Sequence, residues 1–381
     1  MIGNGAVADK VVVVGAGVIG LSCAWQLARR GAGVTVFEKG RRGSGASGAA
    51  LGALWPPAAR HEGTLQKLHR ESLWQFQEFV RQVQDASGLR ISYLRQGKLE
   101  LLTSPRAVAQ AEAETVAANA SWPPLEDGRP VMEVLTRRQA LALAPQVQTR
   151  EYGATLCRRT AQVDMAELLA GLTQACQRAG VEIYEATAVE RLALQPGQVA
   201  GVYVHGELKP ASAVLLCAGV ETGGLGGTVS ALAPIKPIKG QALLLRSQAP
   251  LLDQIVKSGK IFVVPWPDGR LLVGSTTEPQ AGFDLANTAE GVAWLLQGAA
   301  EICPKLKATK LERIWAGLRP AGPGKRPIMG IFPGVPNLYI CGGHYKTGVG
   351  MAPLVGEWMA QLILTGRMEP HLGEFAPGVP A

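Results

Sequence analysis

Residues 11–38 carry the pattern of a β-α-β unit that binds a dinucleotide. Four consecutive valines at 11–14 predict a buried parallel strand, which runs into the G-x-G-x-x-G glycines Gly15, Gly17 and Gly20. In this pattern Gly15 permits the tight turn, Gly17 lets the backbone approach a pyrophosphate, and Gly20 lets the next helix pack close to the strand. Because strand, turn and helix follow at the expected spacing, we predict a dinucleotide site here.

The helix after this turn begins at a point suited to phosphate. Its first N–H groups are free and carry a partial positive charge, which favours the pyrophosphate. Further predicted contacts in the turn are Ala16, Val18 and Ile19. A second strand, 34–37, ends on Glu38 and Lys39, and the Glu38 carboxylate can accept the hydroxyl protons of an adenosine ribose. An acid at this position disfavours a 2′-phosphate and leaves NAD and FAD both open.

A loop of small residues at 43–48 follows the acidic strand and separates these two cofactors. It reads Gly-Ser-Gly-Ala-Ser-Gly and lies where the chain would pass a second time over the pyrophosphate. An NAD-dependent dehydrogenase does not usually place such a loop there, so the loop is the first indication of FAD. The predicted contacts in the loop are Gly45, Ala46 and Ser47.

Composition excludes several classes of protein. The net charge of +8 is spread along the chain as small pairs such as Arg41/Arg42 and Arg137/Arg138, which favours a solvated basic surface over nucleic-acid binding. No apolar run that lacks the dinucleotide glycines reaches the ~20 residues needed to cross a bilayer, so we expect a soluble, cytoplasmic protein with no transmembrane segment. Six scattered cysteines without a C-x-x-C pair indicate reduced thiols and no metal site.

Elements of two kinds alternate along the middle of the chain. A helix is predicted over 64–84, and 91–145 reads as an inserted segment with a strand at 98–102 and a helix at 106–118. The nucleotide fold resumes near 150, where Asp164 begins a capping-box pattern and is predicted to be an N-cap.

Strands dominate the region from 226 to 312. Apolar runs at 241–245, 261–264 and 271–274 predict a sheet of a second domain, and a helix follows at about 287–301.

The C-terminal part carries a second glycine-rich helix start. Residues 338–355 read as a strand, a loop containing Gly-Gly-His-Tyr-Lys-Thr-Gly, and a helix that begins near Gly350. A helix N-terminus stabilises negative charge, which in a flavoprotein is the N1/O2 edge of the reduced ring.

Together these segments resemble the FAD-dependent D-amino-acid oxidase superfamily, and most closely its glycine oxidase and sarcosine oxidase branch. The resemblance covers about 10–367 and rests on the first glycine motif, Glu38, the 45–48 loop, Gly317-Leu-Arg-Pro320, and 343–348 with the Ala352-Pro353 that follows. It implies an α/β fold with a Rossmann-like FAD-binding domain and a second domain built on a mainly antiparallel β-sheet. The expected segments are 1–85, 146–225 and 313–381 for FAD and 86–145 and 226–312 for substrate.

The resemblance also implies further cofactor contacts and non-covalent FAD. Val189 would contact adenine, and the segment 49–54 would run beside the isoalloxazine. The remaining implied cofactor residues are Ala50, Gly52, Ala53, Leu54, Cys217, Ala218, Gly219, His344, Tyr345, Lys346, Thr347, Gly348, Val349 and Arg319. The cysteine that attaches flavin in sarcosine oxidases falls where this chain has Gly-Leu-Arg-Pro, and Cys341 is interpreted as a core residue.

Four residues are candidates for the substrate site. Arg319 matches the family arginine that holds the substrate carboxylate, for which a planar guanidinium is suited. Lys346 and Phe262 stand where glycine oxidases carry an arginine and a tyrosine, which favours a bulkier or more apolar substrate than glycine, and Thr277 borders the site. His344 is interpreted as a structural residue of the flavin loop, since this oxidation needs no base when the amine binds neutral.

The implied function is an FAD-dependent oxidoreductase that converts a small amine or amino acid to its imine by hydride transfer to flavin N5. The electron acceptor is O2 or another acceptor, and a homo-oligomer is possible. An alternative is a flavin-binding subunit of a multi-component amine dehydrogenase with little turnover of its own.

Overall fold

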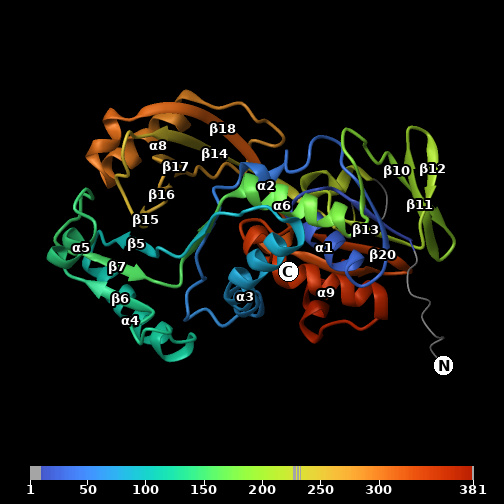
Figure 1. The fold of residues 1–381 in the computed structure, drawn as a ribbon, viewed down its shortest axis with the longest axis horizontal. Coiled ribbons are helices and arrows are strands. Elements are labelled where there is room, and N and C mark those ends of the chain that lie inside the picture. Colours follow the sequence, from blue (N-terminus) through green and yellow to red (C-terminus); the bar gives the residue numbers. More distant parts are fainter. Residues whose placement is uncertain (1–9, 226–228, 230, 232, 380–381) are drawn as a thin grey trace.

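Two large sheets, each with its own helices, make up the computed structural model of this chain (Figure 1). The structure describes residues 10–225, 229, 231 and 233–379. Parts of three predicted domain segments lie outside the described residues. They are 1–9 of the first FAD segment, 380–381 of the last FAD segment, and 226–228, 230 and 232 near the start of the second substrate segment.

The first sheet, on the right of Figure 1, has six strands in the order β19-β20-β13-β1-β2-β9. All neighbours run parallel except β19 and β20. The strands are β1 (Lys10–Val14), β2 (Gly33–Phe37), β9 (Glu182–Tyr184), β13 (Ala213–Leu216), β19 (Ile328–Phe332) and β20 (Val335–Gly342). The carboxyl ends of β1 and β2 therefore meet at one edge, which is where a parallel α/β sheet binds its ligand.

Alternate residues of β1 pack against different layers. Val11 and Val13 join the core under four helices, whereas Val12 and Val14 join the core under a small antiparallel sheet. The helices are α1 (Val18–Ala28), α3 (Thr64–Ser87), α6 (Met165–Arg178) and α9 (Gly348–Thr365). The small sheet comprises β10 (Arg191–Gln195), β11 (Gln198–Val204) and β12 (Glu207–Pro210).

The second sheet has eight strands in the order β18-β14-β17-β16-β15-β5-β7-β6. The strands are β5 (Lys98–Leu101), β6 (Met132–Leu135), β7 (Ala154–Cys157), β14 (Lys236–Arg246), β15 (Ile255–Ser258), β16 (Ile261–Pro265), β17 (Arg270–Gly274) and β18 (Lys310–Ala321). Helix α8 (Ala289–Ile302) covers one face and buries Leu295 against strand residues such as Leu243 and Val263. The other face of this sheet packs against the segment 49–55, which follows helix α2 (Ala46–Ala49).

Short elements connect the two bodies and complete the chain. They are α2 (Ala46–Ala49), β3 (Ala53–Leu54), β4 (Tyr93–Leu94), β8 (Ala161–Val163), α4 (Pro105–Ser121), α5 (Arg137–Leu143) and the 3-10 turns η1 (Gly219–Leu225), η2 (Pro304–Ala308), η3 (Pro323–Lys325) and η4 (Pro370–Phe375). Strands β3, β8 and β4 form a three-stranded sheet of their own.

The predicted elements agree well with the observed ones, and the differences are local. Helices predicted at 64–84, 106–118 and 287–301 correspond to α3, α4 and α8. The last helix begins at Gly348, two residues before the predicted start near Gly350. The boundaries predicted at 146 and 313 differ from the sheet pattern, since β7 and the whole of β18 pair within the eight-stranded sheet.

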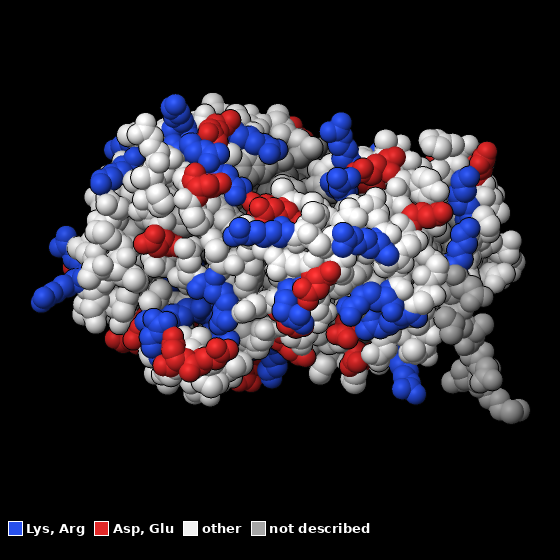
Figure 2. All heavy atoms as spheres, viewed as in Figure 1, with Lys and Arg blue, Asp and Glu red and all other residues white. Residues whose placement is uncertain are grey.

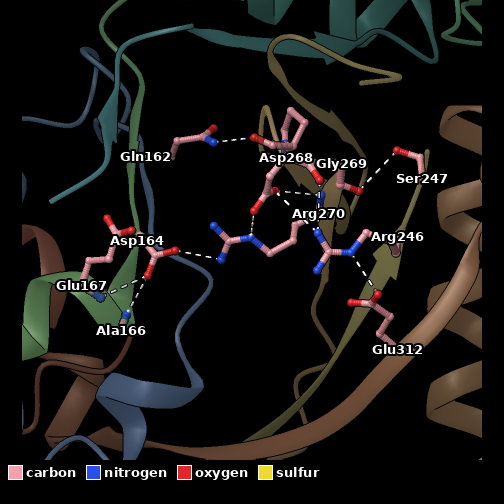
Figure 3. A network of polar contacts seen from close by, with 11 residues as sticks. Gln162, Asp164, Ala166, Glu167, Arg246, Ser247, Asp268, Gly269, Arg270 and Glu312 are labelled. Carbon is pink, nitrogen blue, oxygen red and sulfur yellow. Dashed lines mark hydrogen bonds and ion pairs between the residues drawn. The ribbon is translucent and has the colours of Figure 1, made fainter. Parts of the chain in front are cut away.

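A network of polar contacts joins the eight-stranded sheet to helix α6 (Figure 3). Asp164 is the N-cap of α6, as predicted, and its Oδ1 accepts the N–H groups of Ala166 and Glu167. Its other oxygen lies 2.8 Å from Nη1 of Arg270 on β17. The Glu167 carboxylate accepts the N–H of Ser92, so the second half of the predicted capping box is replaced by a contact to another segment.

We expect Asp164→Ala to destabilise the protein more than Asp164→Asn. Both variants lose the charge that faces Arg270, but asparagine is as good an N-cap as aspartate, and loss of a cap costs about 0.5–2 kcal/mol. Urea unfolding followed by circular dichroism measures this difference in the free energy of unfolding. Equal losses in the two variants would mean that the ion pair, and not the cap, carries the effect.

The hydropathy of the helices and the distribution of charge on one face can be described directly. Among the described residues, no helix is both long and apolar enough to cross a membrane. Lys and Arg are interspersed with Asp and Glu over the face shown in Figure 2, so the excess positive charge is not gathered there.

Candidate active site

The first glycine motif forms the tight turn that its spacing predicts. Gly15 has φ +107, and a Cβ there would lie 2.5 Å from the Cys217 carbonyl oxygen. A Cβ at Gly20 would overlap the Gly15 carbonyl, so helix α1 packs against the turn as closely as backbone allows. Gly17, in contrast, has φ −76 and ψ 176, and a Cβ there would touch only Ser47 Oγ, at 3.1 Å. Neighbouring backbone therefore leaves no room for a side chain at Gly15 or Gly20, whereas the space beside Gly17 is open.

The 43–48 loop lies against the N-terminus of α1. Ser47 Oγ accepts the Val18 N–H at 3.0 Å, and the Gly43 N–H donates to the Ala16 carbonyl at 3.1 Å. A Cβ at Gly45 would meet no atom within 4 Å. The loop thus leaves open backbone beside the helix start where the pyrophosphate is expected.

Glu38 follows β2, and its carboxylate is turned toward the same turn. Its two oxygens accept the N–H groups of Ala16 at 2.8 Å and Gly40 at 2.9 Å. The Glu38 carbonyl accepts the Thr187 N–H at 2.7 Å, which brings the chain leading to Val189 alongside. A carboxylate accepts about four hydrogen bonds, so two remain for ribose hydroxyls.

These residues fit an FAD whose adenosine lies by Glu38 and whose pyrophosphate lies by Gly17. Cys217 continues from β13, and its N–H donates to the Val14 carbonyl at 2.8 Å. A Cβ on Gly219, at φ +58, would also meet open space. Sequence reasoning predicted Gly15, Gly17, Ser47, Glu38, Val189 and Cys217 separately, and the structure brings them to one edge of the sheet.

One row of residues on the eight-stranded sheet faces this edge. Register pairs Trp315 with Ala242, Ala242 with Gly274, and Gly274 with Phe262, so all four share one face. Trp315 Nε1 donates to the Ala49 carbonyl at 3.0 Å. A Cβ at Gly274 would lie 2.8 Å from the Leu51 side chain. The face that carries Phe262 therefore packs on the segment predicted to run beside the isoalloxazine.

Arg319 lies on this same face, because it follows Trp315 and Gly317 at intervals of two along β18. Its Nη1 donates to the carbonyls of Thr276 at 3.1 Å and Lys239 at 3.3 Å, and its Nη2 donates to Ser275 Oγ at 2.7 Å. Burial lowers the pKa of the guanidinium from its ordinary value. Among the described residues no carboxylate forms an ion pair with it.

Gly240, which sequence reasoning missed, makes room for this arginine. A Cβ at Gly240 would overlap the Arg319 guanidinium, so the side chain lies flat over the neighbouring strand. Glycine within a strand often marks a close approach of this kind, and Gly240 lies within β14, between Lys239 and Gln241. That signal was present in the sequence.

Buried polar residues behind the sheet fix the groups that hold Arg319. The Lys239 ammonium, 1% exposed, lies 2.8 Å from Asp284 Oδ2 and 3.6 Å from Glu278 Oε2. Gln241 Nε2 and the Thr276 hydroxyl both donate to Glu278 Oε1. The backbone at Lys239 and Thr276, whose carbonyls accept from Arg319, is thereby anchored from the opposite face. Sequence reasoning did not identify Glu278 or Ser275.

The glycine-rich C-terminal loop lies next to the end of β18. The Tyr345 N–H donates to the Pro320 carbonyl at 2.6 Å, and His344 forms a bridge with Ala321. His344 is buried, and its Nδ1 has no hydrogen-bond partner among the described residues. The loop leads directly into α9, so these contacts place the residues just before α9 beside the end of the strand that carries Arg319.

Two predicted site residues lie farther out. Lys346 is exposed, and its ammonium lies 5.2 Å from the centre of the Tyr345 ring. Thr277 is also exposed, one residue beyond the Thr276 carbonyl that Arg319 contacts. Of the four substrate-site candidates, Arg319 and Phe262 share a sheet face, whereas Lys346 and Thr277 lie at its rim.

We expect the protein to lose stability as the pH falls from about 6.5 to 4. Burial lowers the pKa of His344 to about 4, and burial also lowers the pKa of His69, which packs against Gly350 of α9, to about 4. The unfolded chain protonates near 6.5, so it binds more protons than the folded chain within this window, and full stability is present only above it. A buried group of this kind contributes up to about 3 kcal/mol.

The free energy of unfolding in urea, measured at pH 7, 5.5 and 4, checks this expectation. His69→Gln should flatten the dependence on pH, whereas His371→Gln, which changes an exposed residue, should leave it unaltered. A stability that is constant across the window would contradict the burial of both neutral rings.

Comparisons with known proteins agree with this geometry. A protein-family model described as FAD dependent oxidoreductase (DAO) matches residues 10–362. The chain is 32% identical to a glycine oxidase of Pseudomonas aeruginosa over 378 residues, which covers 98% of this chain and 99% of the relative.

Solved structures give the same result. The crystal structure of glycine oxidase from Geobacillus kaustophilus superposes with a TM-score of 0.87 at 29% identity, covering 97% of this chain and 98% of the other. Iminodiacetate oxidase from Chelativorans sp. BNC1 superposes with a TM-score of 0.86 at 25% identity, covering 96% and 98%.

Proposed function

This chain belongs to the DAO family of FAD-dependent oxidoreductases, and from that premise we propose that it oxidises a small amino acid or N-substituted amino acid at its α carbon. The substrate amine becomes an imine, which water then hydrolyses. The similar proteins named glycine oxidase and iminodiacetate oxidase support this class, because both of their named substrates carry an amine next to a carboxylate.

The observation that carries the proposal is the state of Arg319. A partly buried guanidinium that forms no ion pair among the described residues is costly, and an anionic ligand would offset that cost. Arg319 also lies on the sheet face that packs against residues 49–51, beside the expected ring of the cofactor. Both features support a role in holding the substrate carboxylate.

The hydrogen bonds of Arg319 leave one edge of the guanidinium available. The group has five N–H donors, of which both on Nη1 and one on Nη2 are used by Lys239, Thr276 and Ser275. Nε and Nη2 lie side by side on the guanidinium, and the Nε hydrogen donates to no described residue. Two parallel donors match the two oxygens of a carboxylate, and this pairing fixes the plane as well as the position of the ligand.

An aromatic wall lies beside the place where the rest of the substrate would extend. The rings of Phe262 and Trp55 meet edge to face with their centres 4.9 Å apart, and Leu51 lies against Gly274 in the same row. These apolar groups exclude water from the amine and favour its neutral form. They also suit a substituent larger than the hydrogen of glycine.

When bound, FAD supplies the two-electron acceptor for the hydride that leaves the α carbon. The chain would hold it through the Gly17 turn, Glu38 and the 43–48 loop, with the α9 N-terminus near the ring. His344 would not act as a base, because its ring is enclosed and burial lowers its pKa to about 4. Arg319 would orient the substrate, and Phe262 and Trp55 would exclude water from its amine.

Anaerobic mixing of the purified protein with a panel of amino acids, N-alkylglycines and amines tests the proposal. We expect a yellow protein whose FAD is released by heat or acid, and whose flavin absorbance at 450 nm is bleached by at least one carboxylate-bearing amine. Flavin that remains on the denatured chain would contradict non-covalent binding. A panel that leaves the absorbance unchanged would contradict the amine oxidation.

A further inference from the structure

The row of residues that contains Phe262 continues across the sheet into three charged side chains. Phe262 pairs with Lys257 on β15, and Lys257 pairs with Glu100 on β5, so these side chains share the face that packs against the cofactor body. Lys98 precedes Glu100 by two residues and therefore lies on that face as well. We call Lys98, Glu100 and Lys257 the distal cluster.

The distal cluster carries an excess of positive charge. The Lys98 ammonium lies 2.8 Å from Glu100 Oε2, and the Lys257 ammonium pairs with the other oxygen of the same carboxylate. Burial alone would raise the pKa of Glu100, but the two lysines lower it to about 2, so the carboxylate is ionised. Neither lysine pairs with a second carboxylate among the described residues. Two positive charges therefore face one negative charge.

The side chains of the distal cluster are partly buried. The exposed fractions of its side chains are 13% for Lys98, 26% for Lys257 and 31% for Glu100. A partly desolvated ammonium gains more from an anion than a fully exposed one does, because the effective dielectric constant is lower. Both lysine side chains keep part of their surface exposed to solvent.

Trp55 connects the cluster to the substrate site. Its ring meets Phe262 edge to face, and the Lys98 ammonium lies 5.4 Å from the centre of the same ring. Arg319 lies over Gly240 on β14, and β17 and β16 separate β14 from β15. Three strand spacings amount to about 14 Å between backbones, and the long arginine and lysine side chains leave a shorter gap for a ligand.

We propose that the distal cluster is a subsite for a second acidic group, so that the preferred substrates are amino acids with a carboxylate at the far end of the side chain or N-substituent. The α-carboxylate binds Arg319, the apolar linker packs on Phe262 and Trp55, and the far carboxylate binds Lys257 and Lys98. Glu100 holds both lysines in place. This inference rests on the amine oxidation proposed above.

Achiral probes test the subsite on the FAD-loaded protein. N-carboxyalkylglycines with one to four methylenes in the carboxyalkyl arm are compared with the same compounds bearing a terminal amide, by kcat/KM for flavin reduction. For at least one chain length we expect the acid to be preferred over the amide by tenfold or more. This ratio is measured within each variant, so a loss of folded protein cancels.

Four variants test the subsite by the direction in which each changes the acid-to-amide ratio. Lys257→Gln and Lys98→Gln should each reduce the acid-to-amide ratio about tenfold and leave the amide unaffected. Glu100→Gln should raise the ratio, because it removes the competing negative charge. Lys260→Gln, an exposed lysine on the adjoining turn, is the matched control and should leave the ratio unchanged. A ratio near one in the parent, or equal losses for acid and amide in Lys257→Gln, would overturn the subsite.

A binding measurement separates failure of the subsite from failure of the proposed function. Adipate and butyrate, which lack an amine, are titrated while the flavin absorbance spectrum is followed. We expect adipate to bind at least tenfold more tightly than butyrate, and Lys257→Gln to abolish the difference. If no probe reduces the flavin but this difference is present, the proposed oxidation fails and the subsite stands. Equal affinities would overturn the subsite whatever the oxidation results.

Discussion

Arg319→Ala should retain FAD and lose between tenfold and about a hundredfold in kcat/KM for a carboxylate-bearing amine. A charge-assisted hydrogen bond to a buried partner is worth about 1.5–3 kcal/mol, and the free edge of Arg319 offers two such donors. The loss is measured as the second-order rate constant of anaerobic flavin reduction. Amines without a carboxylate should react equally with the parent and the variant.

We call the paired contact between the Arg319 guanidinium and the substrate carboxylate the clamp. Two further variants separate loss of this clamp from loss of the positive charge and from loss of the fold. Arg319→Lys keeps the charge but not the planar pair of donors, so it should recover only part of the rate. Gly240→Ala keeps the arginine in the sequence but puts a Cβ where its guanidinium lies, so the side chain is displaced and the variant should behave like Arg319→Ala with FAD retained. Full activity of Arg319→Ala with the best carboxylate substrate would rule out the clamp.

Gly17→Val should fold normally and purify without flavin. The backbone at Gly17 has an ordinary extended conformation, and a Cβ would meet only Ser47 Oγ, at 3.1 Å, so a small shift of that hydroxyl lets the folded chain accept a side chain. The same side chain would stand between the start of α1 and the pyrophosphate. Loss of two charge-assisted hydrogen bonds at about 1.5–3 kcal/mol each weakens FAD binding at least a hundredfold. The ratio of absorbance at 450 nm to that at 280 nm and the melting temperature of the apoprotein are the measurements.

Gly20→Ala is the contrasting variant, since its added Cβ would overlap the backbone carbonyl of Gly15. It should lower the free energy of unfolding by about 1–3 kcal/mol, as overpacking does. Gly17→Val should leave it nearly unchanged when apoproteins are compared. A stable Gly17→Val protein that keeps its flavin would place the pyrophosphate elsewhere.

The sequence predicts the cofactor half of the fold well because its signals are local. A valine run, three glycines and Glu38 lie within one short stretch, and each has a backbone role that residue type alone reveals. The Asp164 cap is equally local. The boundaries at 146 and 313 differ from the sheet pattern because β7 and β18 pair with strands far along the chain, and sequence periodicity does not reveal pairing partners.

In the proposed substrate half of the site, only the residue that the family motif marks could be predicted. Arg319 was found from Gly-Leu-Arg-Pro, but Gly240, Ser275 and Glu278 act through register and contacts across the sheet. The distal cluster is likewise invisible along the chain, because Lys98 and Lys257 are 159 positions apart in the printed sequence and meet only through the pairing of β5 with β15.

The most direct test compares one acid with the amine that differs from it only by the carboxylate. N-propylglycine and N-methylpropylamine are mixed anaerobically with the FAD-loaded protein at equal concentrations, and the loss of absorbance at 450 nm is followed. If Arg319 holds the substrate by its carboxylate, the acid bleaches the flavin at least tenfold faster than the amine. Equal rates, or faster bleaching by the amine, would contradict amino-acid oxidation at this site.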